Sequence, residues 1–190
     1  MPLILPKPGV FDLEVKRSKF HAYCAPVDSE DAAKAVLADI RRAHATAGHH
    51  VYAYGVGTVL RCSDDGEPHQ TAGLPVFNVF VKGGVVDFVC VVTRYFGGTL
   101  LGAGGLVRAY SQAAKGALEA AGPTQRILST IYRVMCAYGQ LDKMKWQFKQ
   151  WGVELLDVQY TTQCESRVRV TEHQAELFLQ GTGYTITDEE

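Results

Sequence analysis

The chain has 190 residues, of which 47% are hydrophobic and 21% charged, a composition typical of globular proteins and not of disordered or fibrous ones. Nineteen Lys and Arg side chains oppose twenty Asp and Glu side chains, giving a formal net charge of -1. This balance argues against non-specific binding of nucleic acid through the overall charge of the protein. Binding through a local basic patch remains possible.

The apolar runs and the cysteines indicate the compartment. No apolar run approaches the ~20 residues that span a bilayer, so we expect no membrane segment. The five cysteines are widely spaced and form no Cys-x-x-Cys pair, which favours a cytoplasmic protein with reduced thiols. We expect neither a metal site nor a cofactor.

The first third of the chain combines strand and helix patterns. Residues 10–26 are typical of two strands joined by a polar turn. Asp28 or Ser29 then caps a helix, whose apolar residues recur at helical spacing as far as Arg42. Residues 51–58 have the aromatic and β-branched content of a strand.

The middle of the chain alternates between polar and apolar segments. Residues 61–73 are polar without any period and predict a loop, whereas residues 74–82 fit a short helix as well as a buried strand. Residues 85–93 are almost continuously apolar, which predicts a central strand covered on both faces. Residues 104–121 carry a helical apolar stripe that the Gly-Pro dipeptide at 122–123 ends.

The same dipeptide is the expected boundary between a domain of residues 1–122 and a domain of residues 123–190. The second domain has predicted strands at 128–136, 153–161, 167–171 and 184–187 and predicted helices at 141–151 and 172–179. The order βαββαβ is typical of a ferredoxin-like domain. We therefore expect an α+β fold with two domains.

Five glycines separate the buried strand from the last helix of the first domain. They are Gly97, Gly98, Gly102, Gly104 and Gly105. Glycines let a ligand approach the backbone, and the start of the following helix presents free N–H groups and the positive end of its dipole. The segment predicts an anion site; the alternative is a tight turn where the helix packs on the sheet.

Two arginines flank these glycines. Arg108 lies in the first turns of the helix, where a cation opposes the dipole unless an anion is nearby. Arg94 lies on the other side of the loop, and arginine suits bidentate contact with phosphate or carboxylate. Both could instead form surface ion pairs with the acidic residues of segment 63–68. Tyr95 and Phe96 could stack nucleobases or belong to the core.

Three carboxylates, those of Asp64, Asp65 and Glu67, stand within the sequence Ser-Asp-Asp-Gly-Glu-Pro at 63–68. They could hold Mg²⁺ or serve as general acid and base. They are equally typical of a solvated acidic turn, since Asp-Gly is a common turn pair. The sequence leaves these alternatives open.

Several blocks of the sequence closely resemble the IMPACT family, and bacterial members of the YigZ type in particular. They are the segment 63–68, the Thr-Ala-Gly at 71–73, and the blocks at 92–98 and 101–110. The Lys-Arg-Ser-Lys-Phe at 16–20 also matches. The chain departs from the family pattern at residue 70, where glycine is usual and this chain has glutamine. It departs also at residue 100, where lysine is frequent and this chain has leucine, and at residue 111, where glycine is frequent and this chain has serine. The missing lysine weakens the case for a phosphate site.

The resemblance implies a first domain like the second domain of ribosomal protein S5 and a second domain like the last domain of elongation factor G. It favours a helix at residues 74–82. Eukaryotic relatives regulate translation under amino-acid stress through a partner protein of a kinase. They use an additional domain for this, so that partnership is not expected here.

The leading hypothesis is a non-enzymatic, translation-associated regulatory protein that binds RNA, the ribosome or a translation-factor protein. Its expected binding residues are Arg94, Tyr95, Phe96, Gly97, Gly98, Gly102, Gly104, Gly105 and Arg108, supported by His49, Thr71 and Tyr110. The alternative is a small-molecule enzyme for phosphoryl transfer or hydrolysis, with Asp64, Asp65 and Glu67 as its catalytic candidates.

Overall fold

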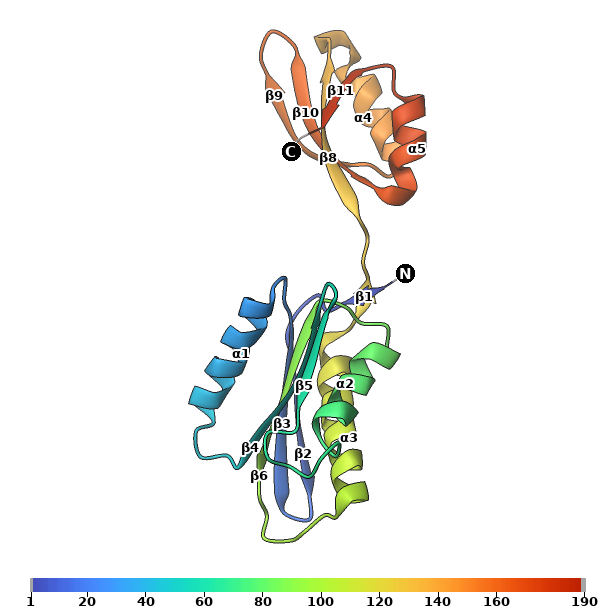
Figure 1. The fold of residues 1–190 in the computed structure, drawn as a ribbon. Helices are drawn as coiled ribbons and strands as arrows, with labels where there is room; N and C mark the ends of the chain where they lie inside the picture. Colours follow the sequence, from blue (N-terminus) through green and yellow to red (C-terminus); the bar gives the residue numbers. More distant parts are fainter. Residues whose placement is uncertain (1, 189–190) are drawn as a thin grey trace. The chain divides into compact units, whose positions relative to one another are not determined.

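The computed structural model describes residues 2–188 and divides into two compact units, one ending at Arg126 and the other beginning at Ile127 (Figure 1). The division falls shortly after the Gly-Pro dipeptide at 122–123. Each unit combines an antiparallel sheet with helices, so the fold is of the expected α+β class. None of the helices in the described part of the chain is long and apolar enough to cross a membrane.

The first unit is built on a five-stranded antiparallel sheet with the order β2-β3-β6-β4-β5. Its strands are β2 (Gly9–Val15), β3 (Ser18–Pro26), β4 (His49–Val56), β5 (Val59–Ser63) and β6 (Phe88–Tyr95). Strand β6 lies at the centre, and every residue in it except Tyr95 is buried. The expectation of a covered central strand is thereby confirmed.

Strand β5 corrects the expectation that a loop begins at residue 61. The backbone of residues 61–63 pairs with residues 52–54 of β4, so the loop begins only at Asp64. β5 is an edge strand with mostly exposed side chains, which is why its sequence shows no apolar period.

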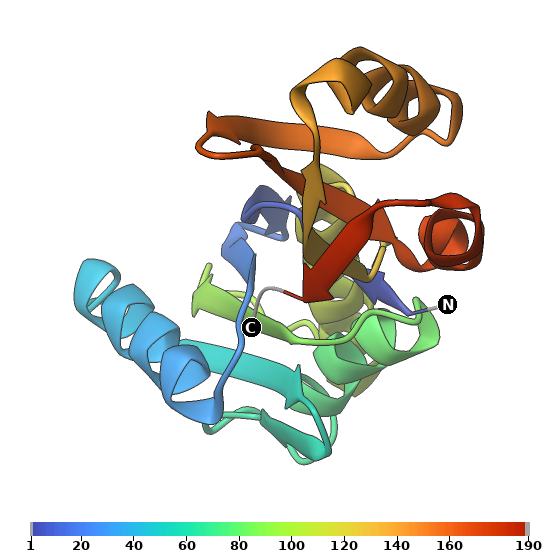
Figure 2. The same ribbon diagram turned by 90° about the horizontal axis from the view of Figure 1, so that it is seen from above.

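Three helices cover the two faces of this sheet. Helix α1 (Glu30–Ala43) lies on one face, while α2 (Gly73–Lys82) and α3 (Ala103–Ala121) lie on the other (Figure 2). Helix α1 begins where the Ser29 hydroxyl accepts the N–H of Ala32, as the sequence predicts. The ambiguous segment 74–82 is a helix.

Close backbone contacts fix how α3 lies along β2. A Cβ added at Gly9 would come within 2.1 Å of the Ala117 carbonyl oxygen, and one added at Gly116 within 2.3 Å of the Phe11 ring. Strand β2 therefore runs antiparallel to α3. The turn after β2 lies beside the first turns of α3, at the end of the unit farthest from residue 126 (Figure 1). Helix α3 ends at Gly122, whose φ is 67°.

Two short strands, β1 (Leu3–Ile4) and β7 (Thr124–Gln125), pair with each other and join the start of the chain to the end of the first unit. The sequence did not predict either strand, because each is only two residues long.

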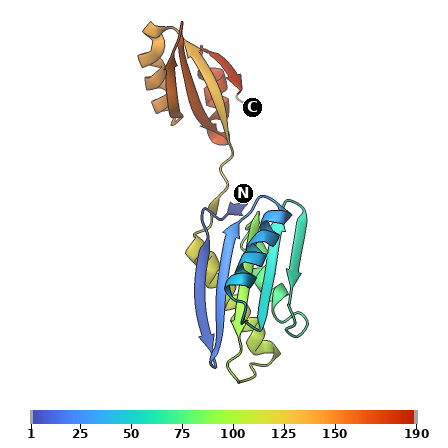
Figure 3. The ribbon, with the colours of Figure 1, turned by 90° about the vertical axis from the view of Figure 1, so that its left-hand side faces the viewer.

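The second unit has the order β8 (Ser129–Cys136), η1 (Tyr138–Gln140), α4 (Leu141–Gln150), β9 (Glu154–Tyr160), β10 (Cys164–Thr171), α5 (Glu172–Gly181) and β11 (Thr185–Asp188). Its strands form an antiparallel sheet with the order β11-β8-β10-β9. Helices α4 and α5 cover one face, and the other face is open, as Figure 3 shows. The core between the helices and the sheet includes Val134, Met144, Phe148, Val168 and Phe178.

Candidate functional site

The acidic loop between β5 and α2 (residues 64–72) is folded onto the protein. The Asp64 carboxylate accepts the backbone N–H groups of Ala72 and Gly73 at 3.0 and 2.8 Å and that of Gln70 at 2.8 Å. It caps the start of α2, because the N-cap residue Ala72 has no side-chain acceptor. Burial raises the pKa of Asp64, but these three N–H donors outweigh burial and hold the pKa below its ordinary value.

Asp65 ties the same loop to α1 and β4. Its carboxylate accepts the backbone N–H of His50 at 2.6 Å and the guanidinium N–H of Arg41 at 2.9 Å. Its carbonyl oxygen lies 2.8 Å from Nδ1 of His49, so that ring nitrogen is the donor. The predicted supporting residue His49 thus helps to position the acidic loop.

Glu67 lies at the centre of a buried polar cluster. Its Oε1 accepts from Nη1 of Arg94 at 2.6 Å and from the Tyr110 hydroxyl at 2.8 Å. Nη2 of Arg94 donates to the Ser18 hydroxyl oxygen at 3.3 Å. Arg94 is only 5% exposed and Tyr110 is fully buried. Ser18, Glu67, Arg94 and Tyr110 are called the Glu67 cluster below.

Aromatic rings pack against the Glu67 cluster. The Arg94 guanidinium lies 5.5 Å from the centroid of the Phe20 ring and 5.7 Å from that of Phe96. The Phe20 ring also meets the Tyr110 ring edge to face, with centroids 5.1 Å apart. Burial and the neighbouring charge of Glu67 raise the pKa of Tyr110 far above its ordinary value, so the hydroxyl stays protonated and donates.

These contacts give the acidic loop a structural role. The carboxylates of Asp64, Asp65 and Glu67 each accept hydrogen bonds from other residues of the protein. Within the described residues, no group of three or more His, Cys, Asp and Glu side chains is placed to hold a metal ion. The hydrogen bonds of the three carboxylates therefore favour a structural interpretation of the acidic loop.

The glycine-rich loop between β6 and α3 is held at one end and open at the other. Gly97 donates its N–H to the Ser18 hydroxyl oxygen at 3.2 Å. A Cβ at this position would lie 2.1 Å from the Arg17 carbonyl carbon, so only glycine allows the contact. Gly98 and Gly102 have φ values of 79° and 71°, and no atom lies within 4 Å of where a Cβ would stand.

The start of α3 presents uncapped backbone donors. Its N-cap residue is Gly102, and no side chain caps the helix. The first turn holds Gly104 and Gly105 and contains no acidic residue. Because the first N–H groups of a helix lack intrahelical acceptors and carry the positive end of the dipole, this end favours an anion.

Exposed cations surround this helix start. Lys16 and Arg17 form the turn between β2 and β3, and Arg108 lies in the second turn of α3. All three are exposed, and no hydrogen bond or ion pair joins their side chains to another residue in the described range. Lys19 is also exposed, but it lies opposite Tyr95 in the β3–β6 ladder and lines a pocket with His44 beside the end of α1, away from the start of α3.

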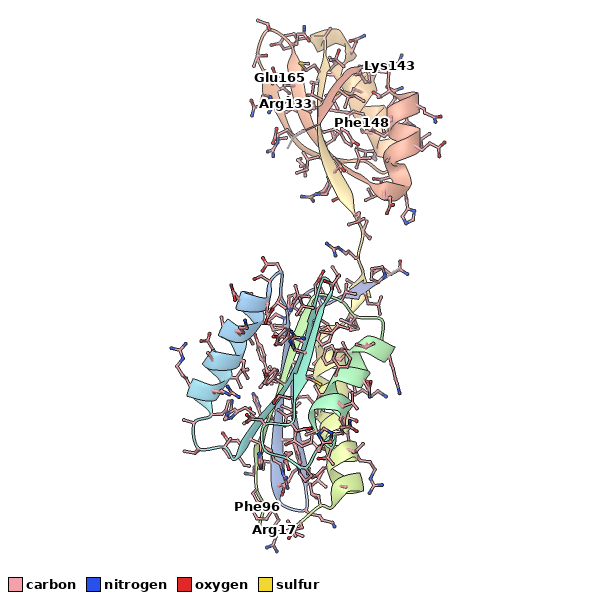
Figure 4. All side chains as sticks on the ribbon, viewed as in Figure 1. Arg17, Phe96, Arg133, Lys143, Phe148 and Glu165 are labelled. Atoms are coloured by element: carbon pink, nitrogen blue, oxygen red, sulfur yellow. The ribbon has the colours of Figure 1, made fainter. Side chains whose placement is uncertain are left out.

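Two large apolar side chains are exposed among these cations. Phe96 is 59% exposed and Leu100 is 83% exposed. Figure 4 shows Phe96 and Arg17 next to each other at the end of the first unit. This surface is called the basic tip; it consists of Lys16, Arg17, Phe96, Leu100 and Arg108.

The turn of the basic tip is conformationally costly. Lys16 and Arg17 have φ values of 48° and 66°, the left-handed values that a two-residue hairpin turn requires. Asn-Gly is the sequence that suits such a turn, and other residues there cost on the order of 1 kcal/mol each. Two cations therefore occupy a turn whose backbone disfavours them, which points to a role other than folding.

The structure divides the expected site residues into two sets. Arg94, which was expected to supply exposed charge, is buried against Glu67, and this expectation is corrected. Tyr95 is also turned away from the tip, with its hydroxyl 2.8 Å from Nδ1 of His44. Thr71 is buried and donates to the Pro68 carbonyl at 2.6 Å. The members at the surface of the tip are Phe96, Gly98, Gly102, Gly104 and Arg108.

Lys16 and Arg17 were not expected in the site. Their signal in the sequence is a run of cations at a predicted turn. What the sequence cannot show is that this turn lies against Gly97, almost eighty residues later, through the Ser18 contacts.

Comparisons with known proteins match the part of the chain that contains this site. The model of the Impact N-terminal domain family matches residues 16–118, which include the acidic loop, the Glu67 cluster and the basic tip. The chain is 36% identical to the IMPACT family member YigZ of Escherichia coli (strain K12), over 88% of this chain and 78% of that protein. It is 32% identical to the IMPACT family member YvyE of Bacillus subtilis (strain 168), over 90% and 81%.

A solved structure described as the crystal structure of an hypothetical protein matches with a TM-score of 0.64 and 31% identity, covering 99% of this chain and 97% of that chain. Together with the family model, these relatives show that the chain belongs to the IMPACT family.

We expect Glu67→Gln to lower the free energy of unfolding by about 3 kcal/mol or more, because it leaves the Arg94 charge buried without a counter-charge. Tyr110→Phe removes one hydrogen bond and should cost about 1–2 kcal/mol. Urea unfolding followed by far-ultraviolet circular dichroism measures both. Equal, small losses in the two variants would contradict the central position of the ion pair.

We expect Asp64→Asn to lower stability by about 1 kcal/mol at pH 7 through the weakened cap of α2. The pKa of Asp64 is lower in the folded than in the unfolded state, so its contribution is present above about pH 4 and is lost as the pH falls through the folded value. Urea midpoints of wild type and variant should converge as the pH falls below the folded pKa of Asp64. A difference between the two urea midpoints that stays constant at every pH would show that the charge of Asp64 does not contribute to stability. Asp31→Asn, at an exposed position of α1, is the control.

Proposed function

We propose that this protein is a non-enzymatic protein that binds RNA, and ribosomal RNA in particular, at the basic tip. The observation that carries the proposal is a set of exposed cations, Lys16, Arg17 and Arg108, near the uncapped start of α3. Their side chains have no partner among residues 2–188. Phosphate oxygens suit both the cations and the free N–H groups. The exposed ring of Phe96 gives an unpaired base a surface on which to stack.

The size and position of the tip support contact with a few phosphates. A chain of net charge -1 cannot bind RNA through bulk charge, but it can do so where several cations lie within one small area. The role in translation that the family resemblance implies is part of the same proposal, as is a cytoplasmic location. The alternative partner is an acidic protein surface. Such a surface has no unpaired bases that could stack on the Phe96 ring.

The detailed fold assignments belong to the proposal as well. We infer a ferredoxin-like second unit from its βαββαβ order and from the strand order β11-β8-β10-β9. The first unit, with one helix on one face of its sheet and two on the other, is assigned to the type of the second domain of ribosomal protein S5 on the family resemblance.

The direct test is binding of a labelled single-stranded RNA, followed by fluorescence anisotropy across a salt series. Three phosphate contacts predict a slope of log K against log salt of about −2, and each of Lys16→Gln, Arg17→Gln and Arg108→Gln should reduce its magnitude by about 0.7. Lys7→Gln, which removes an exposed cation before the other end of β2, is the matched control. Unchanged slopes in all three tip variants, or equal binding of polyglutamate, would overturn the proposal.

A second test separates binding from folding. The double variant Lys16→Asn with Arg17→Gly installs the residues that the hairpin turn favours, so it should unfold at higher urea by about 1 kcal/mol or more. The same variant should bind RNA several-fold more weakly, because two cations are lost. Full RNA affinity in this well-folded variant would show that the turn is not part of the binding surface.

A further inference from the structure

Helix α4 carries basic side chains on an otherwise acidic unit. Residues 127–190 contain six Lys and Arg side chains against nine Asp and Glu side chains. Three of the six, Lys143, Lys145 and Lys149, lie in the ten residues of α4, which holds one acidic residue, Asp142. No ion pair joins these lysines to any other residue that the structure describes.

A tryptophan lies in the middle of the outer face of this helix. The core side of α4 carries Leu141, Met144 and Phe148. With 3.6 residues per turn, Trp146 points away from that side, and its side chain is 63% exposed. Lys143 and Lys149 stand three residues before and after it, so they flank the ring on the exposed face (Figure 4 labels Lys143).

We infer that this outer face of α4, formed by Lys143, Trp146 and Lys149, is a second binding site for single-stranded RNA. An unpaired base stacks on the Trp146 ring, and the adjacent phosphates meet the two lysines. Stacking on an exposed aromatic ring between cations is the usual chemistry of sequence-tolerant single-strand binding. The site lies wholly in the second unit and does not depend on the basic tip.

The arrangement fits RNA better than a membrane surface. An interfacial helix inserts a continuous apolar face into the lipid. The apolar face of α4 is instead buried in the core of the unit, and Trp146 alone remains outside. A duplex fits poorly too, because its bases are already stacked and give the indole ring nothing to contact.

The test is titration of the full chain with a short single-stranded RNA, followed through tryptophan emission. Trp146 and Trp151 are the two tryptophans, and only Trp146 is exposed. RNA should quench the emission, Trp146→Phe should abolish most of the quenching, and it should weaken binding about fivefold or more. Quenching that survives in Trp146→Phe would overturn the inference. A blue-shifted emission of Trp146 in the absence of RNA would also overturn it, because the indole ring would then already be covered.

Charge variants complete the test. Lys143→Gln with Lys149→Gln should reduce the magnitude of the salt slope by about 1.4, whereas Arg169→Gln, whose side chain pairs with Glu154 on the same unit, should leave the slope unchanged. Equal quenching by anionic lipid vesicles or by duplex RNA of the same length would also contradict the inference. The quenching should persist when Lys16, Arg17 and Arg108 of the basic tip are replaced. This result distinguishes a failure of the α4 site from a failure of the basic tip.

Discussion

The ion pair between Glu67 and Arg94 holds together parts of the first unit that are distant in the sequence. It joins the acidic loop to the central strand, and through Tyr110 and Ser18 it reaches α3 and the start of β3. A buried charge without its partner is strongly unfavourable, so these segments keep one arrangement. The basic tip depends on this arrangement, because the Ser18 hydroxyl that accepts from Arg94 also holds the N–H of Gly97.

The sequence predicts the regular elements well where a period or a cap decides them. The capped helix α1, the buried strand β6 and the alanine-striped α3 are examples. The candidate site is predicted only in part, because the direction of a polar side chain depends on partners that folding brings together. Arg94 and Arg108 look alike in the sequence, yet Glu67 draws the first inward and nothing in the described residues draws the second.

Residue 70 is a second example of a feature that the sequence marks but does not explain. The family usually has glycine there, and in this chain Gln70 adopts a φ of 59°, a value that glycine takes without cost. The resemblance marks the position, but only the structure gives the reason: the N–H of Gln70 must turn toward the Asp64 carboxylate that caps α2. The net charge of -1 also does not indicate the site, because it does not reveal the cations at the basic tip and on α4 that have no ion-pair partner among the described residues.

Hydrogen–deuterium exchange of the full chain, with and without single-stranded RNA, tests the central claim most directly. The account predicts that RNA slows exchange of the backbone amides in the glycine-rich loop, the first turn of α3 and the β2–β3 turn. Protection confined to other surfaces of the first unit, with these amides exchanging as fast as before, would contradict it.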